Sequence, residues 1–250
     1  MPSFPVGDIT LHVDEDGSRG ERVLFLHGAL AAGAAFRSQR VALRDDFRLA
    51  FVDLRGHGGS THLGGEVGWE TLTHETMTGD IIALLDALSP GEPVHLVGAS
   101  LGGLVAARVC AERPESVASL ALLGTSATAS AERRAYFERL TPETLPVGTQ
   151  RLAAKWHGEP YWRDLARHLF ARIVAQTPAV YPERLRVARV LVMQASEDEI
   201  LEPGEAEAWV ERIDGRATLA RPPGGHAFFA DGRLGSSAAN AALRAHLTSR

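Results

Sequence analysis

The chain has 250 residues, of which 45% are hydrophobic and 23% charged. A chain of this length and composition can bury a large hydrophobic core, and α/β folds of this size are often single domains. The net charge is −5 at pH 7, and no block of five or more basic residues occurs. We therefore expect neither nucleic-acid binding nor attachment to an anionic membrane surface.

The amino terminus and the cysteine content bear on the cellular compartment. Residues 1–5 lack a basic start followed by a long apolar stretch, and no segment is long and apolar enough to insert into a bilayer. The single cysteine, Cys110, cannot form an internal disulfide, and we expect it to be a small buried apolar residue. These features predict a soluble cytoplasmic protein.

Short apolar runs alternate with segments of helical periodicity in the first half of the chain. Residues 9–13 alternate like a half-exposed edge strand, whereas 23–26 and 49–52 are continuously apolar, as strands covered on both faces should be. Residues 71–88 carry apolar side chains at intervals of three and four, which predicts a helix. These side chains are Ile81, Leu84, Leu85 and Leu88.

The same alternation continues toward the carboxyl terminus. Further buried strands are predicted over 94–97, 120–123 and 190–193, with a shorter one over 217–220 and a helix over 104–111. Strands that alternate with helices predict a parallel sheet with crossover helices. The glycine-rich loops that follow the strands would then gather at the carboxyl edge of the sheet, where such folds bind their ligands.

Residues 128–185 interrupt this alternation. They lack an apolar strand run and are broken repeatedly by proline, which predicts several short helices. We expect a helical lid over 128–185, inserted between two parts of one core domain, 1–127 and 186–250. The insertion is rich in aromatic residues, so its underside is a candidate surface for an apolar substrate, although the rings could instead only hold the lid together. The candidate substrate-binding residues are Trp156, Tyr161 and Trp162.

The motif Gly98-Ala99-Ser100-Leu101-Gly102 lies between a predicted strand and a predicted helix. A nucleophilic serine on a sharp strand-to-helix turn occupies this position, and the glycines allow a strained backbone and close packing. A serine hydroxyl attacks only when a base removes its proton and a carboxylate orients that base. In this kind of fold the partners follow in the order serine, acid, histidine.

The candidate base comes from the four histidines that follow Ser100, which are His157, His168, His226 and His246. The first two fall in the predicted lid, and His246 lies near the end of a terminal helix, where we expect it to be solvated. His226 follows the last strand in a Gly-rich loop and is the predicted base.

The loop after the 190–193 strand supplies the candidate acids, which are Glu197, Asp198 and Glu199. An acid three residues beyond the expected end of the strand can reach back toward the histidine loop. Asp198 is the predicted acid, with Glu197 as the alternative.

Attack on an acyl carbon creates an oxyanion that preorganised N–H groups must stabilise. The backbone N–H of Leu101 directly follows the serine at a helix start, where amides are unpaired and the helix dipole favours negative charge. We expect the second donor to be the backbone N–H of Ala29, in the loop after the 23–26 strand.

For other polar residues we expect structural roles. His27 and His57 are expected to bind loop backbone, and a metal site formed by Asp53, His57 and His62 lacks a tight ligand cluster. The segment around Ser100 also lacks the glycine order of a dinucleotide loop. The sequence therefore predicts no metal and no cofactor.

The motifs together resemble the α/β-hydrolase superfamily, in particular compact members with a small helical cap. The resemblance rests on Phe25–Leu30, Val52–Ser60, Val97–Gly103, the Asp198 loop and Gly224-Gly225-His226. It implies an α/β fold with a mostly parallel eight-stranded sheet, flanking helices and a helical lid, and a triad of Ser100, Asp198 and His226. A serine nucleophile argues against dehalogenase and epoxide-hydrolase members, which resemble this fold but attack with aspartate.

These observations predict a cofactor-free serine hydrolase. It would cleave a small to medium carboxylic ester, lactone or thioester with an apolar acyl group through an acyl-enzyme. Two alternatives remain: cleavage of a carbon–carbon bond in a vinylogous diketone by the same triad, and a non-catalytic receptor with a hydrolase-like pocket. The sequence does not indicate an oligomeric state.

Overall fold

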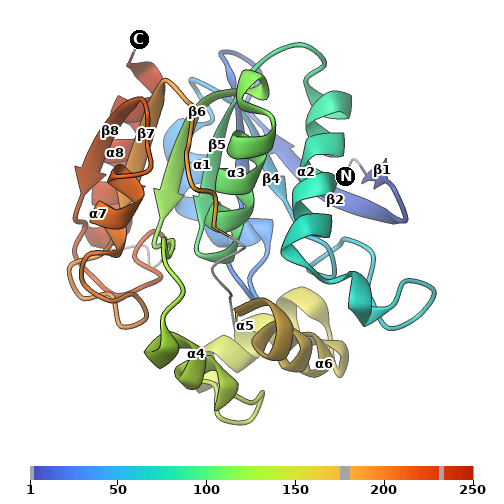
Figure 1. Cartoon of the computed structure of the whole chain (residues 1–250). Helices are drawn as coiled ribbons and strands as arrows, with labels where there is room; N and C mark the ends of the chain where they lie inside the picture. Colours follow the sequence, from blue (N-terminus) through green and yellow to red (C-terminus); the bar gives the residue numbers. More distant parts are fainter. Residues whose placement is uncertain (1–2, 175–180, 231–233, 250) are drawn as a thin grey trace.

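A computed structural model describes residues 3–174, 181–230 and 234–249 (Figure 1). In this part of the chain, eight strands form one sheet in the order β1-β2-β4-β3-β5-β6-β7-β8. The pairings of β1 with β2 and of β2 with β4 are antiparallel, and all others are parallel. The strands are β1 (Ser3–Val6), β2 (Ile9–Asp16), β3 (Arg22–Leu26), β4 (Arg48–Val52), β5 (Val94–Ala99), β6 (Val117–Leu123), β7 (Arg189–Met193) and β8 (Arg216–Ala220).

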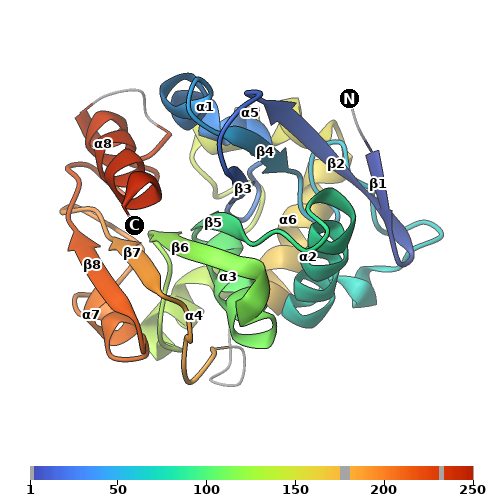
Figure 2. The ribbon, with the colours of Figure 1, turned by 90° about the horizontal axis from the view of Figure 1, so that it is seen from above.

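Helices cover both faces of the sheet, as Figure 2 shows. One face carries α2 (His74–Leu88), α3 (Leu101–Glu112) and α7 (Glu205–Val210), and the opposite face carries α1 (Arg37–Leu43) and α8 (Leu234–Thr248). The prediction of a mostly parallel eight-stranded sheet with flanking helices is therefore confirmed.

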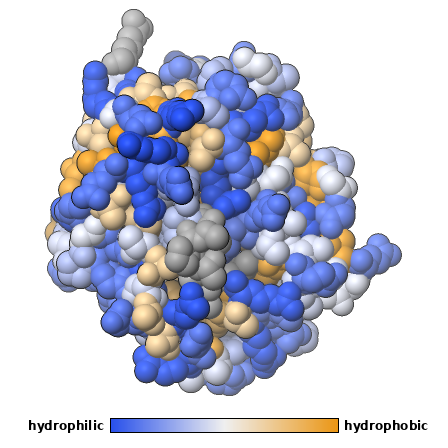
Figure 3. All heavy atoms as spheres, in the orientation of Figure 1, coloured by the Kyte–Doolittle hydropathy of each residue, from blue (hydrophilic) through white to orange (hydrophobic). Residues whose placement is uncertain are grey.

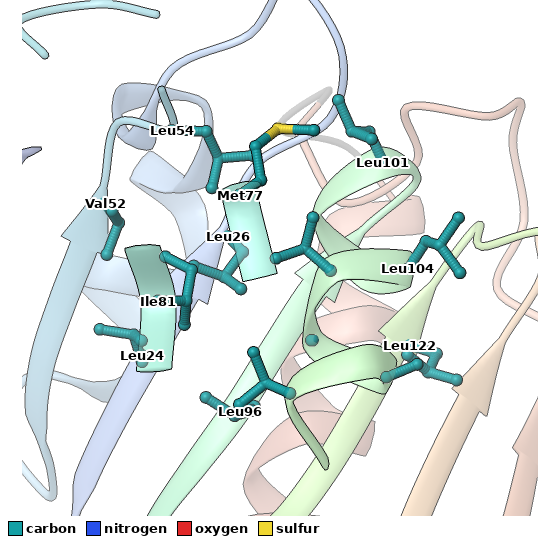
Figure 4. Close-up of a cluster of buried hydrophobic side chains, with 14 of the residues drawn as sticks. Leu24, Leu26, Val52, Leu54, Met77, Ile81, Leu96, Leu101, Leu104 and Leu122 are labelled. Atoms are coloured by element: carbon teal, nitrogen blue, oxygen red, sulfur yellow. The ribbon is translucent and has the colours of Figure 1, made fainter. Parts of the chain in front are cut away.

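The hydrophobic core divides into two layers, one on each face of the sheet. In the first layer, Met77 and Ile81 of α2 and Leu104 of α3 pack against strand side chains (Figure 4). In the second layer, the rings of Phe25 and Phe51 stack at 4.8 Å between their centroids. Because the central strands are buried on both faces, their sequences are continuously apolar.

All seven predicted strands are present, and each extends one to three residues beyond its predicted range. The edge position expected for residues 9–13 is wrong, because β2 lies between β1 and β4. The sequence runs did not predict β1. This strand has four residues and includes Pro5, which lacks a backbone N–H and is tolerated only at an edge. It pairs with β2 at the antiparallel end of the sheet. Most of its side chains are not buried there, so its sequence needs no run of apolar residues.

The segment between β6 and β7 forms helices beside the carboxyl edge of the sheet (Figure 1). They are α4 (Ala131–Glu138), α5 (Val147–His157) and α6 (Tyr161–His168), followed by a π-helical turn over Leu169–Val174. We call residues 128–185 the helical insertion; residues 175–180 within it lie outside the described residues, and its limits remain a prediction.

The surface seen in Figure 3 is mostly hydrophilic, with small separate hydrophobic patches. Across the described ranges, no helix combines the length and the apolar character required to cross a membrane.

Candidate active site

Ser100 occupies the turn between β5 and α3 in a strained conformation. Its φ and ψ are 49° and −115°, in a region that non-glycine residues rarely adopt. Its backbone N–H donates to the carbonyl of Leu123 on β6, at 2.8 Å, and its own carbonyl accepts from Gly103 and Leu104. These bonds hold the strained residue at the carboxyl edge of the sheet.

The flanking glycines are required by close packing. A Cβ at Gly98 would lie 2.4 Å from the carbonyl oxygen of Gly102. A Cβ at Gly102 would lie 2.2 Å from the carbonyl oxygen of Leu26. Both distances are far below van der Waals contact, so the glycine spacing of the motif follows from the approach of α3 to β3 and β5.

Asp198 and His226 are joined by a hydrogen bond. The Nδ1 of His226 lies 3.0 and 3.1 Å from the two carboxylate oxygens of Asp198. The Asp198 side chain is only 1% exposed, whereas that of His226 is 19% exposed. Since a carboxylate only accepts, Nδ1 carries the proton and Nε2 is left with a lone pair to accept another.

The environment keeps Asp198 ionised. Burial by itself would raise the pKa of Asp198, but hydrogen bonds from His226 and from the backbone N–H groups of Ile200 and Leu201 outweigh it, so the pKa lies below its ordinary value. The two backbone bonds are each 3.0 Å long. Asp198 is thus a fixed anion that orients the imidazole.

Ser100 and His226 line one cavity of about 340 Å³. Among the described residues, the Ser100 hydroxyl makes no hydrogen bond. In ligand-free sites, catalytic hydrogen bonds are often long and tighten when substrate binds. The cavity walls are mostly apolar and come partly from the insertion, through Tyr136, Phe137, Leu140, Leu145, Pro146 and Phe170.

The backbone N–H groups of Ala29 and Leu101 belong to residues that line the same cavity, and neither finds an acceptor in the described part of the chain. The Gly28 carbonyl, which shares a peptide group with the Ala29 N–H, accepts from His27 Nδ1 at 2.8 Å and from the N–H of Ala31 at 3.1 Å. In a trans peptide the C=O and N–H point in opposite directions. These two bonds therefore fix the direction of the Ala29 N–H.

His27 and His57 bind loop backbone, as the sequence suggested. Leu54 N–H donates to His27 Nε2 at 3.0 Å, so that His27 Nδ1 carries the proton given to Gly28. His57 Nδ1 donates to the Arg55 carbonyl at 2.9 Å. In the described residues no group of three potential ligands could hold a metal ion.

The three lid residues proposed for substrate binding lie elsewhere. None of Trp156, Tyr161 and Trp162 is among the described residues that line the cavity. The hydroxyl of Tyr161 donates to the Gly56 carbonyl at 2.9 Å, and Trp162 is buried with its Nε1 donating to Glu159. Trp156 lies half-buried on α5. The Trp162 contact lies within the insertion, which fits the alternative that the rings hold the lid together, whereas the Tyr161 contact joins the insertion to the core.

The sequence contained a signal for the residues that do line the cavity. Arg133, Tyr136 and Phe137 of α4 are spaced three and four apart, and such residues share one helix face. The aromatic content of the insertion does not indicate which face of a helix points to the sheet.

Sequence reasoning also missed His157. This buried residue of α5 donates from Nε2 to the Leu30 carbonyl at 3.1 Å and accepts at Nδ1 from the Gly58 N–H at 2.8 Å. It thereby joins the insertion to the Ala29 loop. His246, expected to be solvated, is instead buried, because the face of α8 that carries it packs against the sheet.

The fold and this arrangement define a hydrolase-type α/β protein. The chain belongs to the family described as the alpha/beta hydrolase fold, whose model matches residues 21–176.

Two curated relatives share part of the sequence. A 2-(acetamidomethylene)succinate hydrolase of Mesorhizobium japonicum is 37% identical over 115 residues, which is 46% of this chain and 39% of that protein. A pimeloyl-[acyl-carrier protein] methyl ester esterase of Vibrio vulnificus is 31% identical over 147 residues, which is 59% of this chain and 52% of that protein. The matches span about half or less of the length of these relatives.

Solved structures match over nearly the whole chain. An enol-lactonase from Burkholderia xenovorans LB400 has a TM-score of 0.79 and 20% identity, covering 99% of this chain and 100% of that one. A hydrolase from Pseudomonas aeruginosa PA01 has a TM-score of 0.77 and 22% identity, covering 99% and 98%. At this identity the likeness shows the fold.

Proposed function

We propose that the protein is a serine hydrolase that cleaves a small to medium carboxylic ester, lactone or thioester through an acyl-enzyme. The observation that carries the proposal is the Asp198–His226 hydrogen bond, because it leaves Nε2 of His226 as a proton acceptor in the cavity that Ser100 lines. The similarity to an esterase supports the same reaction class.

In the first half-reaction, Ser100 Oγ attacks the acyl carbon and its proton passes to His226 Nε2. The carbonyl π electrons move to oxygen, and the N–H groups of Ala29 and Leu101 stabilise the negative charge. Asp198 stays ionised and stabilises the imidazolium. The tetrahedral intermediate then collapses, the bond to the leaving group breaks, and His226 gives its proton to that group.

In the second half-reaction, water attacks the acyl-enzyme. His226 takes one proton from the water, and the oxyanion returns to the same two N–H groups. Collapse of this intermediate releases the acid and returns the proton to Ser100. No cofactor enters either step.

The size and lining of the cavity indicate the substrate class. Its volume of about 340 Å³ lies near the lower end of ordinary small-molecule sites. The apolar wall formed by Phe137, Leu140 and Phe170 suits an apolar acyl group.

Turnover of a substrate panel tests this function. Esters, lactones and thioesters of short and medium acyl chains should be hydrolysed by the wild type and not by the Ser100→Ala variant. Hydrolysis that survives in Ser100→Ala would contradict the proposal. Activity on a vinylogous diketone with none on the panel would favour carbon–carbon cleavage, and tight ligand retention without turnover would favour a receptor.

A further inference from the structure

A buried cation lies on the cavity wall, and two carboxylates already bind it. Arg133 of α4 lines the cavity. Its Nη1 donates to Glu205 at 2.8 Å and also to Glu202, and its Nη2 donates to the Thr128 carbonyl. The guanidinium therefore has few donors left for a ligand.

Glu205 is fixed by four donors. Besides Arg133, its carboxylate accepts from the backbone N–H of Ala127 at 2.6 Å and of Thr128 at 3.0 Å, and from the Thr128 hydroxyl at 2.7 Å. The residue is buried on α7. Displacing it would leave buried N–H groups without acceptors, so a substrate carboxylate cannot take its place at low cost.

Glu202 is the more accessible partner, with a side chain 37% exposed. Burial opposes its ionisation, but the Ser130 hydroxyl, its own backbone N–H and the charge of Arg133 outweigh this effect and lower the pKa of Glu202. The cluster of Arg133, Glu202 and Glu205 thus pairs one guanidinium with two carboxyl groups.

Glu199 lines the cavity, and its carboxylate accepts from the backbone N–H of His226 at 2.9 Å. Among the described lining residues, Arg133 is the only arginine or lysine. Glu202 and Glu205 are not among the described lining residues, but they pair with Arg133 and neutralise its charge. An anionic acyl chain would thus meet Glu199 and a guanidinium that is already paired with two carboxylates. Like charges in a partly dehydrated cavity repel strongly.

We propose that Arg133, Glu202 and Glu205 make this cavity select uncharged acyl groups and exclude acyl chains that end in a carboxylate. The inference rests on the proposed acyl hydrolysis and adds the substrate class. Arg133 is then a specificity-determining residue whose charge Glu202 and Glu205 neutralise before any substrate binds. Glu202 is the more exposed of the two partners and is therefore the one to substitute.

Two para-nitrophenyl esters test the selection. They share the leaving group and the chain length, but one acyl chain ends in an isopropyl group and the other in a carboxylate of similar shape. The wild type should prefer the uncharged ester by about 100-fold in kcat/KM, as expected for a charge repelled inside a site. Equal rates, or a preference for the charged ester, would overturn the inference.

Two matched variants locate the effect. Glu202→Gln removes one negative charge beside Arg133, and we expect it to narrow the preference by about tenfold. Glu207→Gln makes the same change in net charge on α7, where Glu207 is 53% exposed and pairs with Arg221, which does not line the cavity. It should leave the preference unchanged. If both variants narrow it equally, or neither does, the cluster does not set the selection.

A binding measurement separates this inference from the proposed reaction. Calorimetry on the Ser100→Ala variant, with the methyl esters of the two acyl chains, needs no turnover. Tighter binding of the uncharged ester supports the selection even if the wild type hydrolyses neither, in which case only the proposed reaction fails. Equal or tighter binding of the charged ester contradicts the selection, whatever the wild type hydrolyses.

Discussion

At the scale of single residues, the Asp198–His226 bond decides which imidazole nitrogen carries the proton. Nδ1–H faces the carboxylate at 3.0 Å, so Nε2 can accept the serine proton. The Asp198→Asn variant can offer its amide N–H to Nδ1 and so favours the wrong tautomer. We expect kcat to fall about 10³- to 10⁴-fold with KM little changed. Steady-state kinetics on the best ester from the panel measures this.

Glu197 provides the control for that prediction. It was the alternative acid in the sequence, and it lies exposed; among the described residues its one hydrogen bond is from its backbone N–H to the Gly224 carbonyl. Glu197→Gln should keep kcat within a few-fold of the wild type. A large loss in Glu197→Gln together with a small one in Asp198→Asn would reverse the assignment of the acid.

The Ala29 donor is a backbone group, so side-chain changes should matter little unless they remove the N–H. Ala29→Ser keeps it, and its activity should stay close to that of the wild type. Ala29→Pro removes it, and kcat should fall about 10²- to 10³-fold. Kinetics on both variants, with circular dichroism to confirm folding, checks this prediction. Equal activities would exclude Ala29 as an oxyanion donor.

Much of the candidate site could be predicted because its residues follow strands. Ser100, Asp198 and His226 each lie in a loop after a parallel strand, and such loops meet at one edge of the sheet. The structure brings Asp198 and His226 into contact as expected, and their catalytic roles remain a prediction. The cavity walls could not be predicted in this way, because the packing of separate helices decides which lid side chains face Ser100.

At the scale of elements, one side chain of α5 connects the insertion to the loop after β3. His157 lies between the Leu30 carbonyl and the Gly58 N–H, and Leu30 has a positive φ of 56°. A non-glycine residue in that conformation needs support from its surroundings. His157 is therefore a positioning residue for the loop that contains Ala29.

Removing this support should affect turnover more than binding. We expect His157→Ala to lower kcat about tenfold with a smaller change in KM, because a displaced N–H weakens stabilisation of the transition state more than that of the bound substrate. His157→Gln, whose amide both donates and accepts, should restore part of kcat. A loss of thermal stability with unchanged kcat would show a purely structural role.

His168 is the comparison for this variant. It lies in α6, where its ring stacks on Trp69 at 4.3 Å, and it does not line the cavity. His168→Ala should leave kcat unchanged. Neither histidine could be assigned from sequence, because the loop that each contacts lies about 100 residues or more away along the chain.

At the scale of the whole molecule, buried neutral histidines make the fold sensitive to acid. Burial is the main cause that lowers the pKa of His74, His157 and His246 to about 4 from an ordinary value of 6.5. Between these values the unfolded chain binds protons that the folded chain does not. Stability is therefore fully present above about pH 6.5 and falls as the pH is lowered toward 4.

Urea denaturation at two pH values checks this effect. As the pH falls through that window, each of the three histidines lowers the free energy of unfolding by roughly 1.4 kcal/mol per pH unit. The urea concentration at the midpoint of unfolding should therefore be clearly lower at pH 5 than at pH 7. His74→Gln, at a side chain whose Nε2 has no partner among the described residues, should reduce the difference. Identical midpoints for the wild type would contradict the burial argument.

The central claim is that Ser100 is a nucleophile activated by His226, and covalent labelling tests it most directly. The protein is incubated with a fluorophosphonate, which reacts with activated serines, and the adduct is mapped by mass spectrometry of its peptides. The account predicts one adduct on Ser100 in the wild type and a much slower reaction in the His226→Ala variant. An unlabelled Ser100, under conditions where a known serine esterase reacts, or equal labelling rates in the two proteins, would contradict it.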